Sequence, residues 1–289
     1  MPEGDTVFRA ARLLDRALQG SVLTRTDLRV PQHATADLSG GLVVGTVSRG
    51  KHLLTRITRD DEAWTLHTHL KMEGAWRVFT AGQRWKRPAH QARVVLEAGT
   101  TSAVGFSLGI VELIATADEP DVVGHLGPDL LGPDWDEAEA LRRLGADPEH
   151  PIGEAPLDQR ILAGAGMQGN SVSGSVRSIG EALLDQRNLA GIGNMWMAET
   201  LFLTGVNPAT KVPDVPDLSK IVRMAYRLLQ ANKERAVQAT TGSTRRGEER
   251  YVYGRRGKAC RRCGTRIQSD QLGPLGRERV TFWCPRCQA

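Results

Sequence analysis

Four cysteines near the carboxy terminus constrain the fold of this chain more than any other feature. Cys260 and Cys263 form one C-x2-C pair, Cys284 and Cys287 form a second, and twenty residues separate the pairs. Such pairs supply the four thiolates that structural Zn²⁺ prefers, and Gly264 lets the chain turn back toward the metal. Two disulfides are the alternative. Because the amino end has neither the basic nor the apolar part of a secretory signal, we expect a reducing, cytoplasmic location and a zinc ribbon.

The distribution of charge favours a nucleic-acid partner. Residues 245–289 carry twelve Lys or Arg against four Asp or Glu, whereas residues 115–156 carry eleven acids and two arginines. A basic module is typical of proteins that contact phosphate backbones, although solvated charge clusters are also common. We interpret the acidic stretch as a solvated connector and helix face. No run approaches eighteen apolar residues, so we expect no membrane partner.

Hydrophobic periodicity predicts an α+β multidomain chain. A period of 3.6 predicts a helix over 5–18, capped by Asp5 or Thr6, and short β-rich runs over 21–117 predict a β-sandwich of six to eight strands. Helical patterns follow at 134–145, 176–187, 194–204 and 217–239, with a Gly/Ser-rich mobile loop at 164–175. We therefore expect an N-terminal helix and β-sandwich domain over 1–117, a helical domain over 118–246 and a zinc finger over 247–289.

The segment "NLAGIGN" lies between two of the predicted helices. Gly191 and Gly193 permit a tight turn that directs backbone N–H groups and the start of the second helix at one point, and Asn194 adds a side-chain donor. A helix N-terminus of this kind suits a phosphate group. An αα-hairpin without a ligand is the alternative.

Four features occur together in this chain: the start "MPEG", the lysine in "SRGKHLL", the turn "GIGN" and the basic zinc ribbon. In this combination the sequence resembles the formamidopyrimidine-DNA glycosylase and endonuclease VIII family of base-excision repair enzymes along essentially its whole length. The resemblance implies an N-terminal helix and β-sandwich in one lobe, a helix-two-turns-helix domain and zinc finger in the other, and damaged DNA between them. It also implies a bifunctional DNA glycosylase with AP-lyase activity.

The same resemblance assigns the catalytic residues. Pro2, the amino terminus once Met1 is removed, is implied as the nucleophile that attacks C1′ and forms an iminium, with Glu3 as general acid/base. Strand cleavage by β,δ-elimination would follow. A terminal secondary amine suits this chemistry, because an α-amino group titrates near pH ~8 and is partly neutral at pH ~7. Lys51 and Arg279 are implied to assist from the phosphates beside the lesion.

The resemblance further implies a set of DNA-binding residues. Base flipping is required because C1′ of a stacked nucleotide is blocked, and the loop "HLKMEGAWR" matches the loop that fills the vacated space. The implied residues are Met72 as the wedge, Lys71 and Glu73 beside it, and Gly193 with Asn194 at a flanking phosphate. A solvated turn for Lys51 and a core position for Met72 are the alternatives.

The expected substrate is an oxidised pyrimidine. The Asp-Pro-Arg-Arg-Phe turn of guanine-lesion enzymes is missing, and "AVGFSLGIVELI" stands in its place. The start "PEGDTV" and the excess of Arg over Lys are most like actinobacterial members of the endonuclease VIII branch. We expect a bacterial, cytoplasmic monomer that holds one structural zinc, uses no catalytic metal and binds no small-molecule cofactor.

Three alternatives stay open at this point. A non-catalytic zinc-finger protein that binds damaged DNA would have no need of Pro2 and Glu3. A metal-dependent nuclease would need clustered carboxylates, and the acids of 115–156 show no such motif. A glycosylase that prefers oxidised purines remains the alternative within the family.

Overall fold

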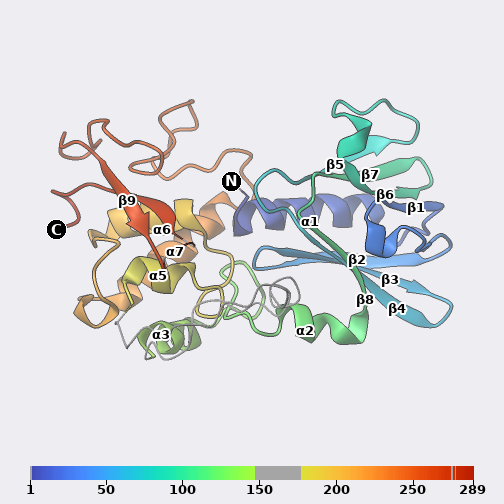
Figure 1. The fold of residues 1–289 in the computed structure, drawn as a ribbon, viewed down its shortest axis with the longest axis horizontal. Helices are drawn as coiled ribbons and strands as arrows, with labels where there is room; N and C mark the ends of the chain where they lie inside the picture. Colours follow the sequence, from blue (N-terminus) through green and yellow to red (C-terminus); the bar gives the residue numbers. More distant parts are fainter. Residues whose placement is uncertain (1, 147–176, 275, 277) are drawn as a thin grey trace. The chain divides into compact units, whose positions relative to one another are not determined.

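The computed structural model describes residues 2–146, 177–274, 276 and 278–289, and it divides into two compact units that meet in the sequence between His125 and Leu126 (Figure 1). The Gly/Ser-rich loop predicted at 164–175 lies outside the described residues. Within the described ranges, no helix combines the length and apolar character that crossing a membrane requires.

The first unit is a β-sandwich with one long helix, as the alternating runs predict. Its two antiparallel sheets have the strand orders β1-β6-β7-β5 and β2-β3-β4-β8. The elements are α1 (Gly4–Leu18), β1 (Arg25–Leu28), η1 (Pro31–His33), β2 (Leu42–Arg49), β3 (His52–Arg59), β4 (Glu62–His69), β5 (Ala75–Thr80), η2 (Ala89–Gln91), β6 (Ala92–Ala98), β7 (Thr101–Phe106), β8 (Ile110–Ala115), η3 (Thr116–Asp118) and α2 (Glu119–Val123).

Helix α1 contacts strands of both sheets and closes their shared core. Its apolar face buries Val7, Leu14 and Leu18 among side chains of both sheets, as the 3.6-residue period predicts. The predicted cap was wrong. The N-cap is Glu3, whose main-chain oxygen accepts hydrogen bonds from the Thr6 and Val7 N–H groups at 2.9 and 3.0 Å. The helix therefore begins at Gly4, immediately after the Pro-Glu pair.

The second unit packs helices around α6 and carries the carboxy-terminal finger (Figure 1). Helix α6 contacts α5, α7 and β10, and it is buried on nearly every side, which explains its almost continuous apolar sequence. The elements are α3 (Glu137–Gly145), α5 (Ile179–Leu184), α6 (Asn194–Thr204), η4 (Val212–Asp214), α7 (Leu218–Asn232), β9 (Gln268–Leu272) and β10 (Arg279–Trp283).

Three helices of the second unit are shorter than their sequence patterns predict. Helix α3 begins at Glu137 and not at residue 134. Helix α5 begins after Ser178, which forms a capping box with Glu181. Helix α7 ends at Asn232 and not at residue 239. The Asn232 side-chain amide donates to the main-chain oxygens of Leu228 and Ala239 and accepts from the Ala239 N–H, so it holds the chain in a turn at this point.

Two acids in the described part of the 115–156 stretch, Glu119 and Asp129, are buried, contrary to the sequence interpretation. Glu119 is 9% exposed and receives two hydrogen bonds from the Arg56 guanidinium, at 2.8 and 2.7 Å, and one from the Thr65 hydroxyl at 2.6 Å. Burial raises the pKa of Glu119, but these hydrogen bonds outweigh it and hold the pKa below its usual value. Glu119 thus fixes the start of α2 to β3 and β4.

Candidate functional site

The Pro-Glu pair lies where the chain enters α1. Pro2 is partly exposed, whereas the Glu3 side chain is completely buried. The next acid, Asp5, is also fully buried and lies 3.9 Å from the Arg9 guanidinium, one turn along the helix. A reactive amine at Pro2 would therefore sit at the helix N-terminus beside two buried carboxyl groups.

The two loops that carry the predicted DNA-contacting residues of the first unit lie at one end of the same sheet. Lys51 is in the turn between β2 and β3, after Gly50 with a φ of 58°. Met72 is in the loop between β4 and β5 and is 63% exposed, which excludes the core position considered for it. Lys71 has a φ of 49°, and a Cβ added at Gly109 would overlap its side chain. The Lys71 side chain therefore packs directly against Gly109.

Three histidines connect these loops, and sequence analysis missed them. His52 opens β3, directly after Lys51, and pairs in register with His69 at the end of β4. His52 and His67 have ring nitrogens 2.9 Å apart, and the ring centroids of His52 and His69 are 5.1 Å apart in an edge-on contact. The signal was present in "HTH", because residues i and i+2 of a strand share a face.

The environment of these rings keeps two of them neutral. Burial, reinforced by His69, His67, His125 and Lys71, lowers the pKa of His52 to about 2. Burial, with Lys71, Lys51 and His67, lowers the pKa of His69 to about 3. The two lysines therefore lie near the same imidazole, so the fold brings Lys51 and Lys71 into one electrostatic environment.

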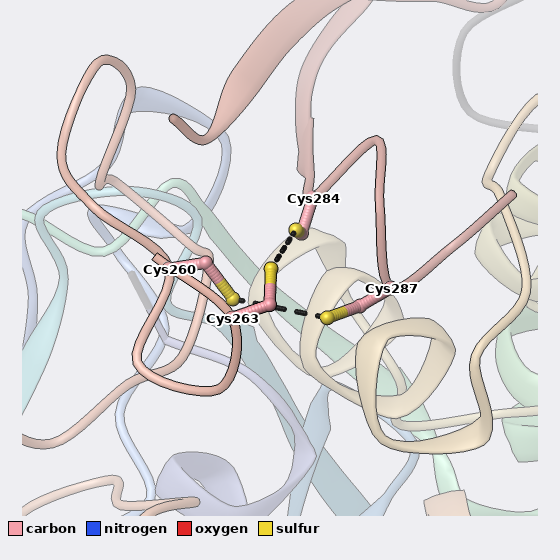
Figure 2. A group of neighbouring side chains, drawn as sticks. All are labelled: Cys260, Cys263, Cys284 and Cys287. Carbon is pink, nitrogen blue, oxygen red and sulfur yellow. Dashed lines mark hydrogen bonds between the residues drawn. The ribbon is translucent and has the colours of Figure 1, made fainter. Parts of the chain in front are cut away.

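The four cysteines form one cluster, as their spacing predicts (Figure 2). Their sulfur atoms all lie within 4.8 Å of one another, with 4.0 Å between Cys260 and Cys287 and 3.4 Å between Cys263 and Cys284. All four are free thiols, so the disulfide alternative is wrong. Tetrahedral zinc with Zn–S bonds of about 2.3 Å places sulfurs about 3.8 Å apart, which these distances match. The finger therefore holds one structural zinc.

Local geometry supports the metal cluster. Gly264 has a φ of 78° and its N–H donates to the Cys260 oxygen at 2.9 Å, which is the turn that the sequence predicts behind the first pair. Helix α6 supports the approach to the finger. Its fully buried Glu199 accepts main-chain hydrogen bonds from Tyr251, Val252 and Tyr253 at 2.8–2.9 Å. Sequence analysis did not single out Glu199.

The "GIGN" turn joins α6 to the finger hairpin. Gly191 has a φ of 95°, which requires glycine, whereas Gly193 is extended and serves as the N-cap of α6. The Asn194 amide donates to the main-chain oxygen of Val280 on β10 at 2.8 Å. Arg279, the residue before, is exposed at the start of this strand. Within the second unit, the predicted residues Asn194 and Arg279 are thus brought together.

The sequence matches three family models in the order that this architecture requires. Residues 1–107 match the formamidopyrimidine-DNA glycosylase N-terminal domain, residues 167–246 match its H2TH domain, and residues 257–289 match the zinc finger found in FPG and IleRS. The matched segments together cover most of the chain.

Curated relatives are similar along the full length. The chain is 48% identical to "Probable endonuclease 8 2" of Streptomyces coelicolor, covering 100% of this chain and 94% of that protein. It is 44% identical to "DNA-(apurinic or apyrimidinic site) lyase Nei2" of Mycolicibacterium smegmatis, covering 100% and 99%. The expected likeness to actinobacterial endonuclease VIII proteins is confirmed.

Solved structures share the fold. A Lactococcus lactis Fpg in complex with DNA that contains an abasic site superimposes with a TM-score of 0.75 at 22% identity over 100% of both chains. MutM in complex with DNA containing carbocyclic 8-oxo-G gives a TM-score of 0.74 at 23% identity, again over both whole chains. With the family matches and the full-length relatives, this places the chain in the formamidopyrimidine-DNA glycosylase family, to which it therefore belongs.

Proposed function

We propose that this protein is a bifunctional DNA glycosylase and AP lyase of base-excision repair, with Pro2 as its nucleophile. The observation that carries the proposal is the Pro2-Glu3 pair at the start of α1, in a chain of this family. The names of its relatives, endonuclease 8 and DNA-(apurinic or apyrimidinic site) lyase, agree with this activity.

The proposed chemistry begins once Met1 is removed. The neutral Pro2 nitrogen forms a bond to C1′ of the damaged nucleotide, and the glycosidic bond breaks as the base leaves with a proton. Glu3 protonates the sugar ring oxygen as the ring opens, which leaves a cationic iminium between C1′ and the Pro2 nitrogen. A secondary amine suits this step, because its imine is necessarily cationic and attracts electrons.

The iminium then drives strand cleavage. It acidifies C2′, so loss of a C2′ proton expels the 3′ phosphate by β-elimination. Loss of a second proton, from C4′, expels the 5′ phosphate by δ-elimination. Water hydrolyses the remaining imine and restores the Pro2 amine. The two eliminations couple proton loss to the departure of a phosphate, and the last step is hydrolysis by water, so the proposed sequence requires no divalent ion.

DNA binding is assigned to two groups of residues. In the first unit, Lys51 and Lys71 supply positive charge at one end of the sheet, and the exposed Met72 is the proposed wedge for the space left by the extruded nucleotide. In the second unit, Gly193, Asn194 and Arg279 are the proposed phosphate contacts. A helix N-terminus next to an exposed guanidinium favours an anion.

The zinc serves the finger and not the chemistry. Cys260, Cys263, Cys284 and Cys287 would supply all four ligands of the ion, which would leave no position for a substrate or water. The metal therefore holds rigid the β9–β10 hairpin that carries Arg279.

For the substrate we propose an oxidised pyrimidine in damaged DNA, removed by a cytoplasmic monomer. The support is the endonuclease 8 character of the full-length relatives and the segment "GFSLGI", which lacks the arginine-rich turn of guanine-lesion enzymes.

Incision assays on duplexes that contain one oxidised pyrimidine, one oxidised purine or one abasic site, all in EDTA, test this proposal. We expect a one-nucleotide gap with phosphates at both ends, and faster turnover of the pyrimidine lesion. Loss of all activity in EDTA would favour a metal-dependent nuclease, and faster excision of the purine would overturn the substrate assignment.

A further inference from the structure

A chain of hydrogen bonds crosses three strands of the β2-β3-β4-β8 sheet below the Lys51 and Met72 loops. Glu112 on β8 lies opposite His67 on β4, and its carboxylate is 2.9 Å from the His67 Nδ1. The His67 Nε2 is in turn 2.9 Å from the His52 Nδ1 on β3. The His67 side chain is completely buried between these two partners.

The Glu112 carboxylate stands at one end of these hydrogen bonds and determines which nitrogen donates in each of them. An ionised carboxylate only accepts hydrogen bonds, so Glu112 requires the proton on the His67 Nδ1. In a neutral His67 the Nε2 is then an acceptor, and it takes the Nδ1 proton of His52. The lone pair of His52 is consequently on its Nε2. One carboxylate thus fixes the tautomer and the ring orientation of two successive imidazoles.

The third histidine links this chain to the wedge loop. The Lys71 N–H donates to the His69 Nδ1 at 2.9 Å, so a neutral His69 carries its proton on Nε2. The His69 ring also makes the edge-on contact with His52. Lys51 precedes His52 directly, and Lys71 and Met72 follow His69 by two and three residues. Both DNA-contacting loops are therefore attached to one pair of rings.

We propose that Glu112, His67 and His52 are positioning residues, whose directional hydrogen bonds hold the His52–His69 pair in the orientation that places Lys51 and the Lys71-Met72 loop on DNA. This inference rests on the proposed function of those loops. A cluster that only stabilised the sheet would change the free energy of unfolding and leave turnover by the folded enzyme unaltered.

The matched variants are Glu112→Gln and Glu112→Leu. Both remove the charge and keep a side chain of similar size, but only glutamine retains an oxygen that accepts from the His67 Nδ1–H. Glu112 is at the sheet surface with a side chain 24% exposed, so leucine is tolerated there. We therefore expect Glu112→Gln to turn over at close to the wild-type rate and Glu112→Leu to turn over much more slowly than both.

Two readouts test the proposal. Nitrogen-15 NMR of the histidine rings reports the tautomers, with signals assigned by single histidine-to-glutamine variants. We expect protons on Nδ1 of His52 and His67 and on Nε2 of His69 in the wild type and in Glu112→Gln. In Glu112→Leu we expect a changed tautomer of His67 or His52. Single-turnover excision from a damaged duplex, measured well below the melting temperature, should fall between about tenfold and about a hundredfold in Glu112→Leu.

Three outcomes overturn the inference. They are wild-type turnover in Glu112→Leu, equal losses in the leucine and glutamine variants, and a wild-type His52 that carries its proton on Nε2. The NMR measurement of the tautomers needs no DNA. It therefore still shows which nitrogens donate in these hydrogen bonds if the wild-type enzyme forms no covalent intermediate and the proposed function itself fails.

Discussion

The side-chain amide of Asn194 donates a hydrogen bond to the main-chain oxygen of Val280, with 2.8 Å between nitrogen and oxygen. This bond attaches the first residue of α6 to the second strand of the finger, one residue from Arg279. Asn194 therefore has a structural task in addition to its proposed phosphate contact, and its substitution should affect both stability and DNA binding.

We expect Asn194→Ala to lower the free energy of unfolding by about 1 kcal/mol, because one hydrogen bond within the protein is lost. Affinity for lesion-containing DNA should fall as well. The control is Asn207→Ala, whose amide reaches the Gln288 oxygen at the longer distance of 3.4 Å. Urea titrations measure the first effect and DNA titrations the second. Unchanged DNA affinity in Asn194→Ala would remove Asn194 from the proposed phosphate site.

Arg279→Ala should weaken DNA binding and make it less dependent on salt. Each phosphate contact contributes about 0.9 to the slope of log K against log salt for duplex DNA, so the slope should become shallower by about that amount. Zinc content should stay at the wild-type value, since Arg279 is exposed and outside the cysteine cluster. Arg256→Ala, at another exposed arginine of the finger, is the control. Equal slopes for wild type and Arg279→Ala would contradict the contact.

Met72→Ala should reduce excision from duplex DNA on the order of tenfold, and cleavage of a preformed abasic site in a single strand far less. Extruding a nucleotide costs a few kcal/mol of stacking and pairing, and an apolar side chain in the vacated space offsets part of that cost. Val44→Ala is the control, because Val44 is also apolar and is 51% exposed, on β2. Similar losses on both substrates would argue against a wedge.

The histidine cluster predicts a loss of stability in mild acid. His52 and His69 have folded-state pKa values of about 2 and about 3, below the ordinary histidine value. Between those values and about pH 6.5, the unfolded chain binds protons that the folded chain does not. Stability therefore rises with pH in this window and is lost as the pH falls, by at most about 1.4 kcal/mol per pH unit for each ring.

Urea unfolding between about pH 5 and about pH 7.5 measures this dependence. The other titratable and charged groups around the two rings are His67, His125, Glu112, Lys51 and Lys71. The wild type and each variant must therefore be compared with all five of these residues unchanged. The double variant His52→Gln/His69→Gln should show a weaker dependence on pH than the wild type, whereas His90→Gln, at an exposed position, should not. The same dependence in all three proteins would show that the rings are not kept neutral by the fold.

The sequence was sufficient for features that depend on local periodicity or spacing. Alternating apolar residues predicted the sandwich, and two C-x2-C pairs predicted the sulfur cluster, because each pattern has few physical solutions. Element ends were less predictable. The end of α7 depends on how the Asn232 side chain bonds to Ala239, and the start of α1 depends on the Glu3 main chain.

Long-range polar partners could not be predicted at all. Glu119 meets Arg56 across 63 positions of the chain, which depends on where α2 packs against β3, and Glu112 meets His67 across 45, which depends on the register between β4 and β8. Strands β4 and β8 are far apart in the sequence, so no short turn between them sets their register. For this reason the solvated character expected for Glu119 was wrong and the histidine cluster was missed. The roles of the neighbouring Lys51 and Met72 come from the resemblance and stay predictions.

The most direct test of the account is borohydride trapping on damaged DNA. Reduction of the iminium should lock the protein to a damaged or abasic oligonucleotide, and mass spectrometry should place the cross-link on a peptide that begins at Pro2. The matched control is the same protein with a retained N-terminal tag. The tag converts the Pro2 nitrogen into an amide whose lone pair is delocalised, so trapping and excision should both disappear while DNA binding persists. Full excision by a protein whose amino end is shown to be blocked would contradict the account and make Lys51 the first alternative nucleophile.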